Sequence, residues 1–341
     1  MTNMADNTAH THIITLWLGL CALMILTMTG IGAITRLTES GLSITEWNVV
    51  SGTLPPLSHE SWQEAFDKYQ KTPEFQQKHD WMRLSDFKKI FFWEWFHRLW
   101  GRMIGLVFAL PLIVFWVKGW IVREDRLKFL GLLMLGGTQG ALGWFMVKSG
   151  LVDRPSVSHF RLAAHLSLAL IIYALTITLM VYLNRAKIPP LKPPASLIHL
   201  GLITLTSLTV TIIWGAFTAG LDAGMIYNSF PLMGEGLVPP ELGKTPFLSD
   251  SASVQFTHRL LAILTGALTL TYAYRTKRQH PRLGGVIAGL VLLQISLGIA
   301  TLLSAVMIPL AVMHQICAVL LLTSVVASLS WSIFSRSNIA A

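Results

Sequence analysis

Charged residues are scarce in this chain of 341 residues: Asp, Glu, Lys and Arg make up only 13% of it, whereas hydrophobic residues make up 53%. A water-soluble domain carries about 25% charged and about 45–50% apolar residues. Half the usual charge cannot cover the surface of a soluble body of this size. The composition therefore excludes a cytosolic enzyme, a disordered chain and a secreted disulfide scaffold, and it favours an all-α polytopic membrane protein.

Cysteine and acidic residues are also scarce. The only two cysteines in the sequence, Cys21 and Cys317, both fall inside apolar stretches, so no framework of loop disulfides can be built. Lys plus Arg number 26 against 17 for Asp plus Glu, which gives a net charge of +9. In a membrane protein such an excess reflects the topology of the loops. We therefore expect membrane lipid around the chain and no nucleic-acid partner.

Long apolar runs predict eight transmembrane helices, because a helix needs about 20 mostly apolar residues to span a bilayer. The first run, 13–34, is too long for a cleaved signal peptide, and no small-residue cleavage site follows it. The last run, 283–335, contains no Asp, Glu, Lys or Arg, and we divide it at Met307–Pro309 because proline interrupts helices. The predicted spans are 13–34, 95–117, 129–147, 162–183, 196–219, 254–274, 283–305 and 310–334.

The charges of the loops predict the orientation of these spans. Three loops are rich in Lys and Arg: 118–128, 184–195 and 275–282. The loop 220–253 has four acids and one lysine. Because basic loops face the cytoplasm, both tails, 1–12 and 335–341, are predicted to be cytoplasmic. The outer loop 35–93 then lies on the other side, either as an amphipathic cap on the bilayer or as an ordinary folded loop.

An internal repeat runs through the chain. The segment 32–56 resembles 215–240, since both open with Gly-Ala-x-Thr, place an acid two residues before a glycine, and end in Pro-Pro. Three more features recur in the same order: HRLWGRMIG at 97–105 and HRLLAILTG at 258–266, QGALG at 139–143 and QISLG at 294–298, and His165 and His314. Chance explains one such match but not four in register.

The repeat predicts the domain organisation. We expect eight transmembrane helices in two pseudo-symmetric four-helix bundles, related by parallel duplication because each half contains four spans. The N-terminal half is 13–183 and includes the outer loop 35–93, and the C-terminal half is 196–334. The segment 184–195 is the cytoplasmic linker between them. No Arg-rich, Ser-rich presequence precedes the first span, which favours a bacterial inner (cytoplasmic) membrane over a mitochondrial one.

Four of the eleven histidines lie within predicted spans at a common depth. His97, His165, His258 and His314 fall a few residues inside the outer ends of the second, fourth, sixth and eighth spans. A polar side chain within a span is functional by default, although each of these alone could simply hydrogen-bond across helices. Two imidazoles facing each other across a four-helix bundle form the axial ligand set of a heme iron. Zinc fits less well, because no Cys, Asp or Glu lies at ligand spacing.

Three arginines accompany these histidines. Arg98 and Arg259 each follow a histidine directly, and Arg161 precedes His165 by four residues. An arginine at the outer boundary can pair with a heme propionate. Snorkelling of the guanidinium groups to the lipid headgroups explains each arginine equally well when it is taken alone.

The two halves differ at one informative position. Glu94 lies three residues before His97, on the same helix face, and the matching residue of the second half is Gln255. A carboxylate in a site of low dielectric can exchange protons and stabilise a developing cation. A salt bridge to Arg98 is the structural alternative for Glu94. The simplest interpretation is an electron-carrying heme in the second half and a reactive, substrate-like position in the first.

Several of these segments resemble the heme A synthase family of proteobacteria and mitochondria. They are GAITRLTESGLS, EWFHRLWGR and RLAAHL in the first half, and THRL and MHQ in the second. The resemblance covers nearly the whole chain. It implies an eight-helix protein of two four-helix halves that oxidises the C8 methyl of heme O to the formyl group of heme A for cytochrome oxidase assembly. The scheme it implies is two successive hydroxylations with water as the oxygen source, followed by loss of water.

The resemblance also assigns residues. It implies that His258 and His314 ligate a permanent heme b, that His97 and His165 flank the heme O substrate, and that Glu94 matches the catalytic glutamate. Some members carry a cysteine pair in the outer loops, which this sequence lacks, so a mechanism that requires the pair does not apply here.

The same resemblance implies a heme O synthase and oxidase assembly factors as partners, while the electron acceptor and any homo-oligomer stay open. Two other functions compete with this one. A diheme b-type electron-transfer membrane protein would explain the four histidines but gives the Glu94 and Gln255 difference no role. A heme exporter or chaperone would need an alternating-access pathway, against which rigid paired ligands argue.

Overall fold

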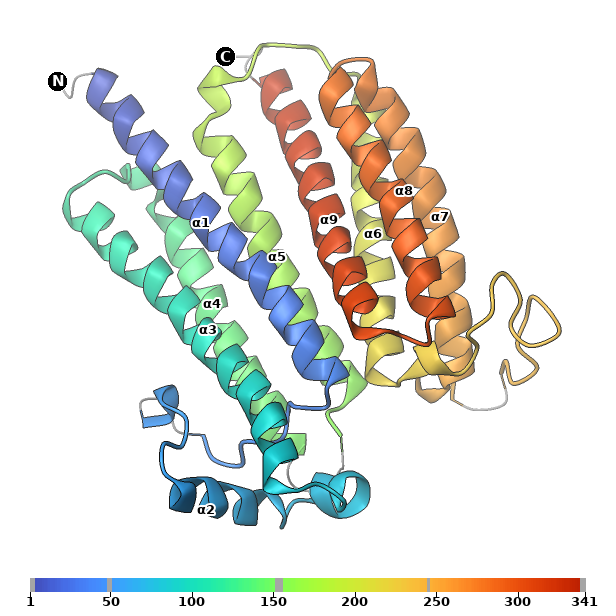
Figure 1. Cartoon of the computed structure of the whole chain (residues 1–341). Helices are drawn as coiled ribbons and strands as arrows, with labels where there is room; N and C mark the ends of the chain where they lie inside the picture. The colour runs from blue at the N-terminus through green and yellow to red at the C-terminus, as the bar shows by residue number, and fades with distance from the viewer. Residues whose placement is uncertain (1–3, 48–50, 151–155, 244–245, 338–341) are drawn as a thin grey trace.

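The computed structural model describes residues 4–47, 51–150, 156–243 and 246–337, and within these ranges the protein is built from helices without a β-strand (Figure 1). The α-helices are α1 (Met4–Leu37), α2 (His59–Tyr69), α3 (Leu84–Val117), α4 (Arg126–Gly150), α5 (His159–Leu183), α6 (Ala195–Gly220), α7 (Ser251–Lys277), α8 (Pro281–Leu303) and α9 (Ile308–Ser337). The all-α class predicted from the sequence is therefore confirmed.

Seven helices of the described chain are long and apolar enough to cross a membrane: α1, α3, α4, α5, α6, α8 and α9. The remaining predicted span, 254–274, lies within α7, which has 27 residues and is therefore also long enough. It is less apolar than the other long helices, because it contains His258, Arg259 and several Ser and Thr residues. Many of these hydroxyls are satisfied by the chain itself, since Thr265 bonds to Ser207 of α6 and Thr269 to the backbone carbonyl of Thr265.

One helix begins earlier than the sequence predicts, and one predicted break between helices is present. The helix expected to start at 95 starts at Leu84, so the outer segment is shorter than 35–93 and its last residues belong to α3. The long uncharged run breaks as predicted, because α8 ends at Leu303 and α9 starts at Ile308. In the turn between them Ala305 and Val306 have φ of 51° and 61°, which reverses the chain direction within four residues.

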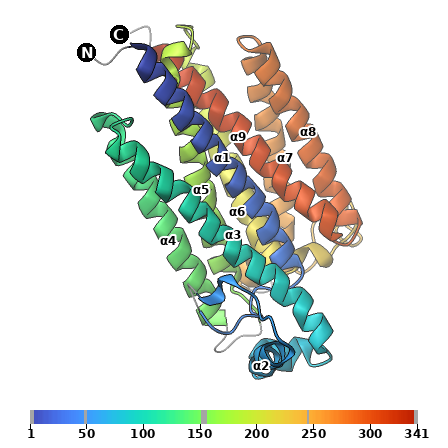
Figure 2. The same cartoon turned by 60° about the vertical axis from the view of Figure 1, so that its left-hand side comes forward.

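The helices of each half pack in the same cyclic order. In the first half α1 packs on α3, α3 on α4, α4 on α5 and α5 on α1; in the second, α6 packs on α7, α7 on α8, α8 on α9 and α9 on α6. The halves meet where α1 and α5 contact α6 and α9, so that α3 and α4 lie at one edge of the molecule and α7 and α8 at the other (Figure 1, Figure 2). The start of α1 and the end of α9 lie at the end opposite α2.

Two residues at equivalent positions of the repeat share an unusual backbone conformation. Glu39 follows the end of α1 and Asp222 follows the end of α6, and the two residues have φ of 49° and 51°. Both positions carry the acid of the repeated Gly-Ala-x-Thr segment. Asp222 Oδ1 also forms an ion pair with Arg36 Nη2 at 2.9 Å, which connects the end of α1 to the end of α6.

The outer segment between α1 and α3 is a folded unit with its own apolar cluster. The cluster contains Phe66, Tyr69, Phe87, Ile90 and Phe91, with Trp62 and Phe75 packed against it. Helix α2 begins with a capping box, in which Ser58 and Ser61 exchange side-chain and backbone hydrogen bonds. Phe87, Ile90 and Phe91 of the cluster belong to α3, so the segment packs on the start of that helix.

Candidate functional site

The four histidines singled out in the sequence lie on the two diagonal helix pairs. His97 is on α3 and His165 on α5, which face each other across the first ring of helices, and His258 and His314 occupy α7 and α9 of the second ring. All four side chains are half-buried. His97 and His165 are close enough for the charge of one to act on the other, and the same holds for His258 and His314. His97 thus lies within electrostatic range of His165, and His258 of His314.

Each imidazole ring faces a glycine on a neighbouring helix. A Cβ atom at Gly143 would lie 3.0 Å from His165 Cε1, and one at Gly298 would lie 2.8 Å from His314 Cε1. At Gly215 the distance to His258 Cε1 is 3.2 Å, and at Gly32 the distance to His97 Cε1 is 3.9 Å. Distances near 3 Å are too short for a methyl group, so Gly143, Gly215 and Gly298 leave room for their rings, whereas the 3.9 Å at Gly32 is an ordinary contact.

The glycines belong to the internal repeat. Gly32 and Gly215 open the two Gly-Ala-x-Thr segments, and Gly143 and Gly298 close the two Gln-x-x-Leu-Gly segments. The sequence repeat therefore corresponds to a repeated contact between a ring and a helix backbone. The motifs themselves were visible in the sequence, but the contact was not, because it joins residues of different helices.

Two glutamines of the site were missed in the sequence. Gln139 Nε2 lies 3.4 Å from His165 Nε2 and donates to the His165 carbonyl at 3.0 Å. Gln294 Nε2 lies 3.3 Å from His314 Nε2. Both glutamines open the Gln-x-x-Leu-Gly segments, so the signal that could have identified them was their place in the repeat.

The histidine pairs fit a metal bound between two rings. The buried Nδ1 atoms of His165, His258 and His314 have no hydrogen-bond partner in the described chain. No group of three or more His, Cys, Asp and Glu side chains gathers among the residues described, so a catalytic zinc would lack its three protein ligands.

Glu94 lies one turn before His97 and is almost completely buried, with 2% of its surface exposed. Its Oε2 accepts hydrogen bonds from Ser43 Oγ and from the backbone N–H of Ile44, both at 2.7 Å. Its Oε1 accepts from Arg98 Nη2 at 2.6 Å. The salt bridge to Arg98 considered in the sequence is therefore present, and the outer segment after α1 supplies the other donors.

Arg98 and Arg259 each donate a hydrogen bond to a backbone carbonyl at the same position of the repeat. Arg98 Nη2 donates to the Ile44 carbonyl at 3.1 Å, and Arg259 Nη2 donates to the Tyr227 carbonyl at 2.9 Å. Ile44 and Tyr227 occupy the same position of the repeat. Each arginine therefore fastens the segment that follows the first helix of its half.

The halves differ at the residue beside each arginine. Glu94 accepts the N–H of Ile44, whereas Gln255, at the matching place, donates its Nε2 to the carbonyl of Tyr227 at 3.0 Å. The first half thus places a buried carboxylate near its histidine pair, and the second half places a neutral amide. Arg161, the third predicted arginine, lies with its guanidinium 4.9 Å from the centre of the Phe145 ring.

Comparison with known proteins extends these observations. The family model described as COX15-CtaA, cytochrome oxidase assembly protein, matches residues 15–326. Three curated relatives named heme A synthase are similar over most of their length. The protein of Rhodospirillum centenum is 49% identical over 312 residues, covering 89% of this chain and 83% of the relative. That of Maricaulis maris is 43% identical over 326 residues (93% and 94%), and that of Nitrosospira multiformis is 41% identical over 324 residues (91% and 91%).

Proposed function

The chain belongs to the COX15-CtaA family of cytochrome oxidase assembly proteins, and on that premise we propose how its two helical halves divide the conversion of heme O to heme A. The protein is a membrane oxidoreductase that acts on heme O in cytochrome oxidase assembly, as heme A synthases do. The observation that carries the proposed division is the repeated pairing of His97 with His165 and of His258 with His314, each ring set against a helix glycine.

We infer eight membrane-spanning helices in two pseudo-symmetric four-helix bundles. Support for α7 as the eighth comes from its packing against both α6 and α8 and from the hydrogen bonds of its hydroxyl groups inside the bundle. A polar helix crosses a bilayer at low cost when its polar groups are satisfied by neighbouring helices. With basic loops inside, both termini face the cytoplasm of a bacterial inner membrane.

The second half holds the resident cofactor in this proposal. His258 and His314 would ligate the iron of a heme b, and Arg259 lies at the outer end of the pair, where heme propionates would reach. Such a heme accepts and passes on single electrons. The neutral Gln255 beside it adds no carboxylate to this half, which suits a carrier of electrons rather than a reacting group.

The first half binds the substrate. His97 and His165 would flank heme O, with Arg98 and Arg161 on the side of its propionates. The conversion of the methyl group to a formyl group with water as the oxygen source releases four protons and four electrons: R–CH3 + H2O → R–CHO + 4 H⁺ + 4 e⁻. Glu94 is the buried carboxylate nearest this pair in sequence, and it would stabilise positive charge that develops at the methyl carbon or accept a proton from the attacking water.

Pigment analysis tests this function. The chain is expressed in a bacterial host that makes heme O but lacks heme A synthesis, and the hemes extracted from the purified protein are identified by mass and absorption spectrum. We expect about one heme b per chain together with heme O or heme A. Two equal b-type hemes without any heme A would identify a diheme electron carrier instead. A heme O synthase as supplier and oxidase assembly factors as recipients follow from the same proposal.

A further inference from the structure

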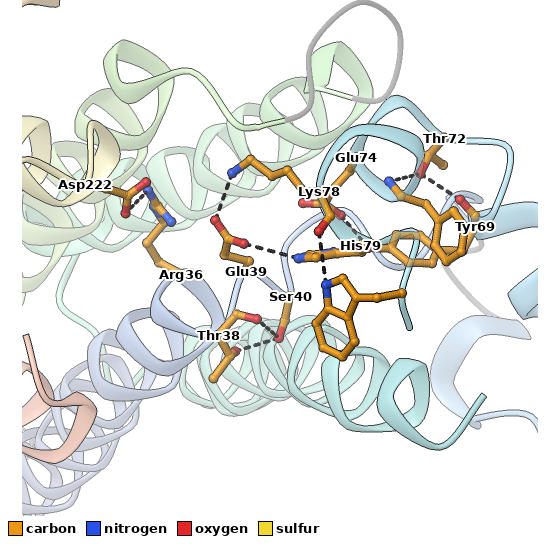
Figure 3. A network of polar contacts seen from close by, with 12 residues as sticks. Arg36, Thr38, Glu39, Ser40, Tyr69, Thr72, Glu74, Lys78, His79 and Asp222 are labelled. Carbon is orange, nitrogen blue, oxygen red and sulfur yellow. Dashed lines mark hydrogen bonds and ion pairs between the residues drawn. The ribbon is translucent and has the colours of Figure 1, made fainter. Parts of the chain in front are cut away.

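A chain of five hydrogen-bonded side chains runs through the outer segment, separate from the histidine pairs (Figure 3). The Tyr69 hydroxyl lies 3.1 Å from Glu74 Oε2 and 2.7 Å from His79 Nδ1. The other ring nitrogen of His79, Nε2, lies 3.2 Å from Glu39 Oε2. Lys78 Nζ donates to the second carboxylate oxygen of Glu39 at 2.9 Å.

The chain connects a buried end to a partly exposed end. Glu74, Tyr69 and His79 have 4%, 0% and 5% of their surface exposed. The Glu39 side chain is 36% exposed. Buried polar groups of this kind are usually satisfied by fixed partners, and here every partner is itself a group that can carry a proton.

Counting donors and acceptors shows that this chain holds one movable proton. If Glu74 is ionised, Tyr69 donates to it, and His79 must then be a cation that donates from Nδ1 to Tyr69 and from Nε2 to Glu39. If Glu74 is protonated, it donates to Tyr69, Tyr69 donates to His79 Nδ1, and neutral His79 donates from Nε2 to Glu39. Both arrangements satisfy every contact. They contain the same number of protons and differ only in proton positions: the His79 Nδ1 proton moves to the Tyr69 oxygen while the hydroxyl proton moves on to Glu74 Oε2, and the reverse shift carries a proton from Glu74 to His79.

We propose that Glu74, Tyr69 and His79 form a proton relay that takes up protons released in the first half of the protein and discharges them at Glu39, on the outer surface. The proposal rests on the proposed function, because that oxidation frees four protons for each substrate molecule. Glu94 is close enough for its charge to act on both Tyr69 and Glu74, which places the buried end of the relay beside the reacting half.

The electrostatic surroundings suit this role. Burial raises the pKa of Glu74 to about 8, with the charges of Glu94 and Glu39 acting in the same direction and Tyr69 and Lys78 acting against it. The hydrogen bond from His79, together with Lys78, lowers the pKa of Glu39 to about 2. Burial also raises the pKa of Tyr69, so its hydroxyl passes protons on without becoming ionised. The relay thus has an acid that exchanges near neutral pH at its buried end and, at the other, a partly exposed carboxylate that passes protons to solvent without retaining them.

A purely structural network is the competing explanation, and Glu74→Gln separates the two. The amide of Gln can donate to the Tyr69 oxygen as a protonated Glu74 would, so the contacts survive while proton transfer stops. Tyr69→Phe removes only the hydroxyl, and Tyr173→Phe is its matched control, because Tyr173 of α5 is also a buried tyrosine whose hydroxyl bonds to a side chain, Thr323 of α9, outside this network. The heme absorption spectrum and the helical circular dichroism report whether each variant is folded.

The experiment has two arms. In the first, infrared spectra of the full-length protein in lipid nanodiscs are recorded from pH 6 to 10. We expect a protonated carboxyl band that disappears near pH 8 and that is missing in Glu74→Gln. In the second, heme O oxidation is measured from pH 6 to 9 in H2O and D2O. Tyr69→Phe and Glu74→Gln should each lower the rate by about 100-fold, the scale of a positioned proton carrier, and raise the solvent isotope effect, while Tyr173→Phe behaves as wild type.

Either arm can overturn the relay. Folded Glu74→Gln protein with the wild-type rate, pH profile and isotope effect would show that the network is structural. An unchanged carboxyl band in Glu74→Gln would show that Glu74 does not hold the proton. If the wild-type protein makes no heme A at all, the proposed function fails, and the infrared arm still decides where the proton lies.

Discussion

The carboxylate of Glu94 accepts a hydrogen bond from Arg98 Nη2 at 2.6 Å, one turn further along α3. The same spacing occurs in the second half, where Gln255 and Arg259 do not bond to each other but share the carbonyl of Tyr227 as acceptor. The two halves thus share this spacing but differ in the residue that stands four positions before the arginine. The first half has a buried carboxyl group one turn before His97, and the second half has an amide one turn before His258.

Replacement of Glu94 by Gln should stop turnover and leave heme binding intact. The amide keeps the size of the carboxylate but turns one acceptor into a donor, which meets Arg98 or the N–H of Ile44. We expect the oxidation of heme O to fall by about 100-fold or more, while the heme b spectrum of the second half is unchanged. Unchanged turnover would dismiss Glu94 from the reaction, and loss of the heme b spectrum would indicate general misfolding.

Replacement of Gly298 by Ala should weaken heme binding in the second half. The new methyl group would lie 2.8 Å from His314 Cε1 and would push the ring from its position. Overpacking of this kind costs about 1–3 kcal/mol, which is about five- to 150-fold in heme affinity. Gly289→Ala on the same helix is the control, because nothing lies within 4 Å of the added atom. Equal heme b content in both variants, measured after extraction, would contradict the assignment.

The matching replacement in the first half should spare heme b. A methyl group at Gly143 would lie 3.0 Å from His165 Cε1, whereas one at Gly140 meets nothing within 4 Å. Gly143→Ala is therefore expected to reduce the binding and oxidation of heme O, and Gly140→Ala is not. Heme b content should be normal in both. A loss of heme b in Gly143→Ala would show that the two halves do not bind their hemes separately.

The stability of the protein should depend on pH through Glu74. Its pKa rises from 4.5 to about 8 on folding, so the folded chain binds more protons than the unfolded chain between these values. The free energy of unfolding therefore falls as the pH rises through this window. Glu74→Gln removes this contribution and should make the thermal midpoint in detergent less dependent on pH between about 5 and 8. A wild-type midpoint equally flat over that range would contradict the raised pKa.

Much of the fold could be predicted from the sequence, because the length of apolar runs and the placement of charges decide which segments cross a membrane. It also located the break between α8 and α9, at an interruption by proline. The start of α3 at Leu84 was missed because residues 84–94 are helical yet mixed in polarity, and packing against the outer aromatic cluster stabilises them. The sequence also predicted a span at 254–274, within α7, although this helix is more polar than the others.

The candidate site was predictable to the extent that the repeat marks it. His97, His165, His258 and His314 stood out because apolar surroundings make any histidine conspicuous. Their partners did not, because Gln139 and Gln294 approach them from other helices and nothing in a single sequence measures that distance. The contacts among Tyr69, Glu74 and His79 were hidden for the same reason, since ordinary polar residues of a loop give no sign that folding will bury them together.

The division of labour between the halves is tested most directly by the pigments of two histidine variants. His97→Ala and His314→Ala are expressed beside the wild type in a host that supplies heme O, and the extracted hemes are identified by mass and absorption spectrum. We expect that His97→Ala retains heme b and yields no heme A, whereas His314→Ala loses heme b itself. Loss of the same pigment in both variants would contradict it.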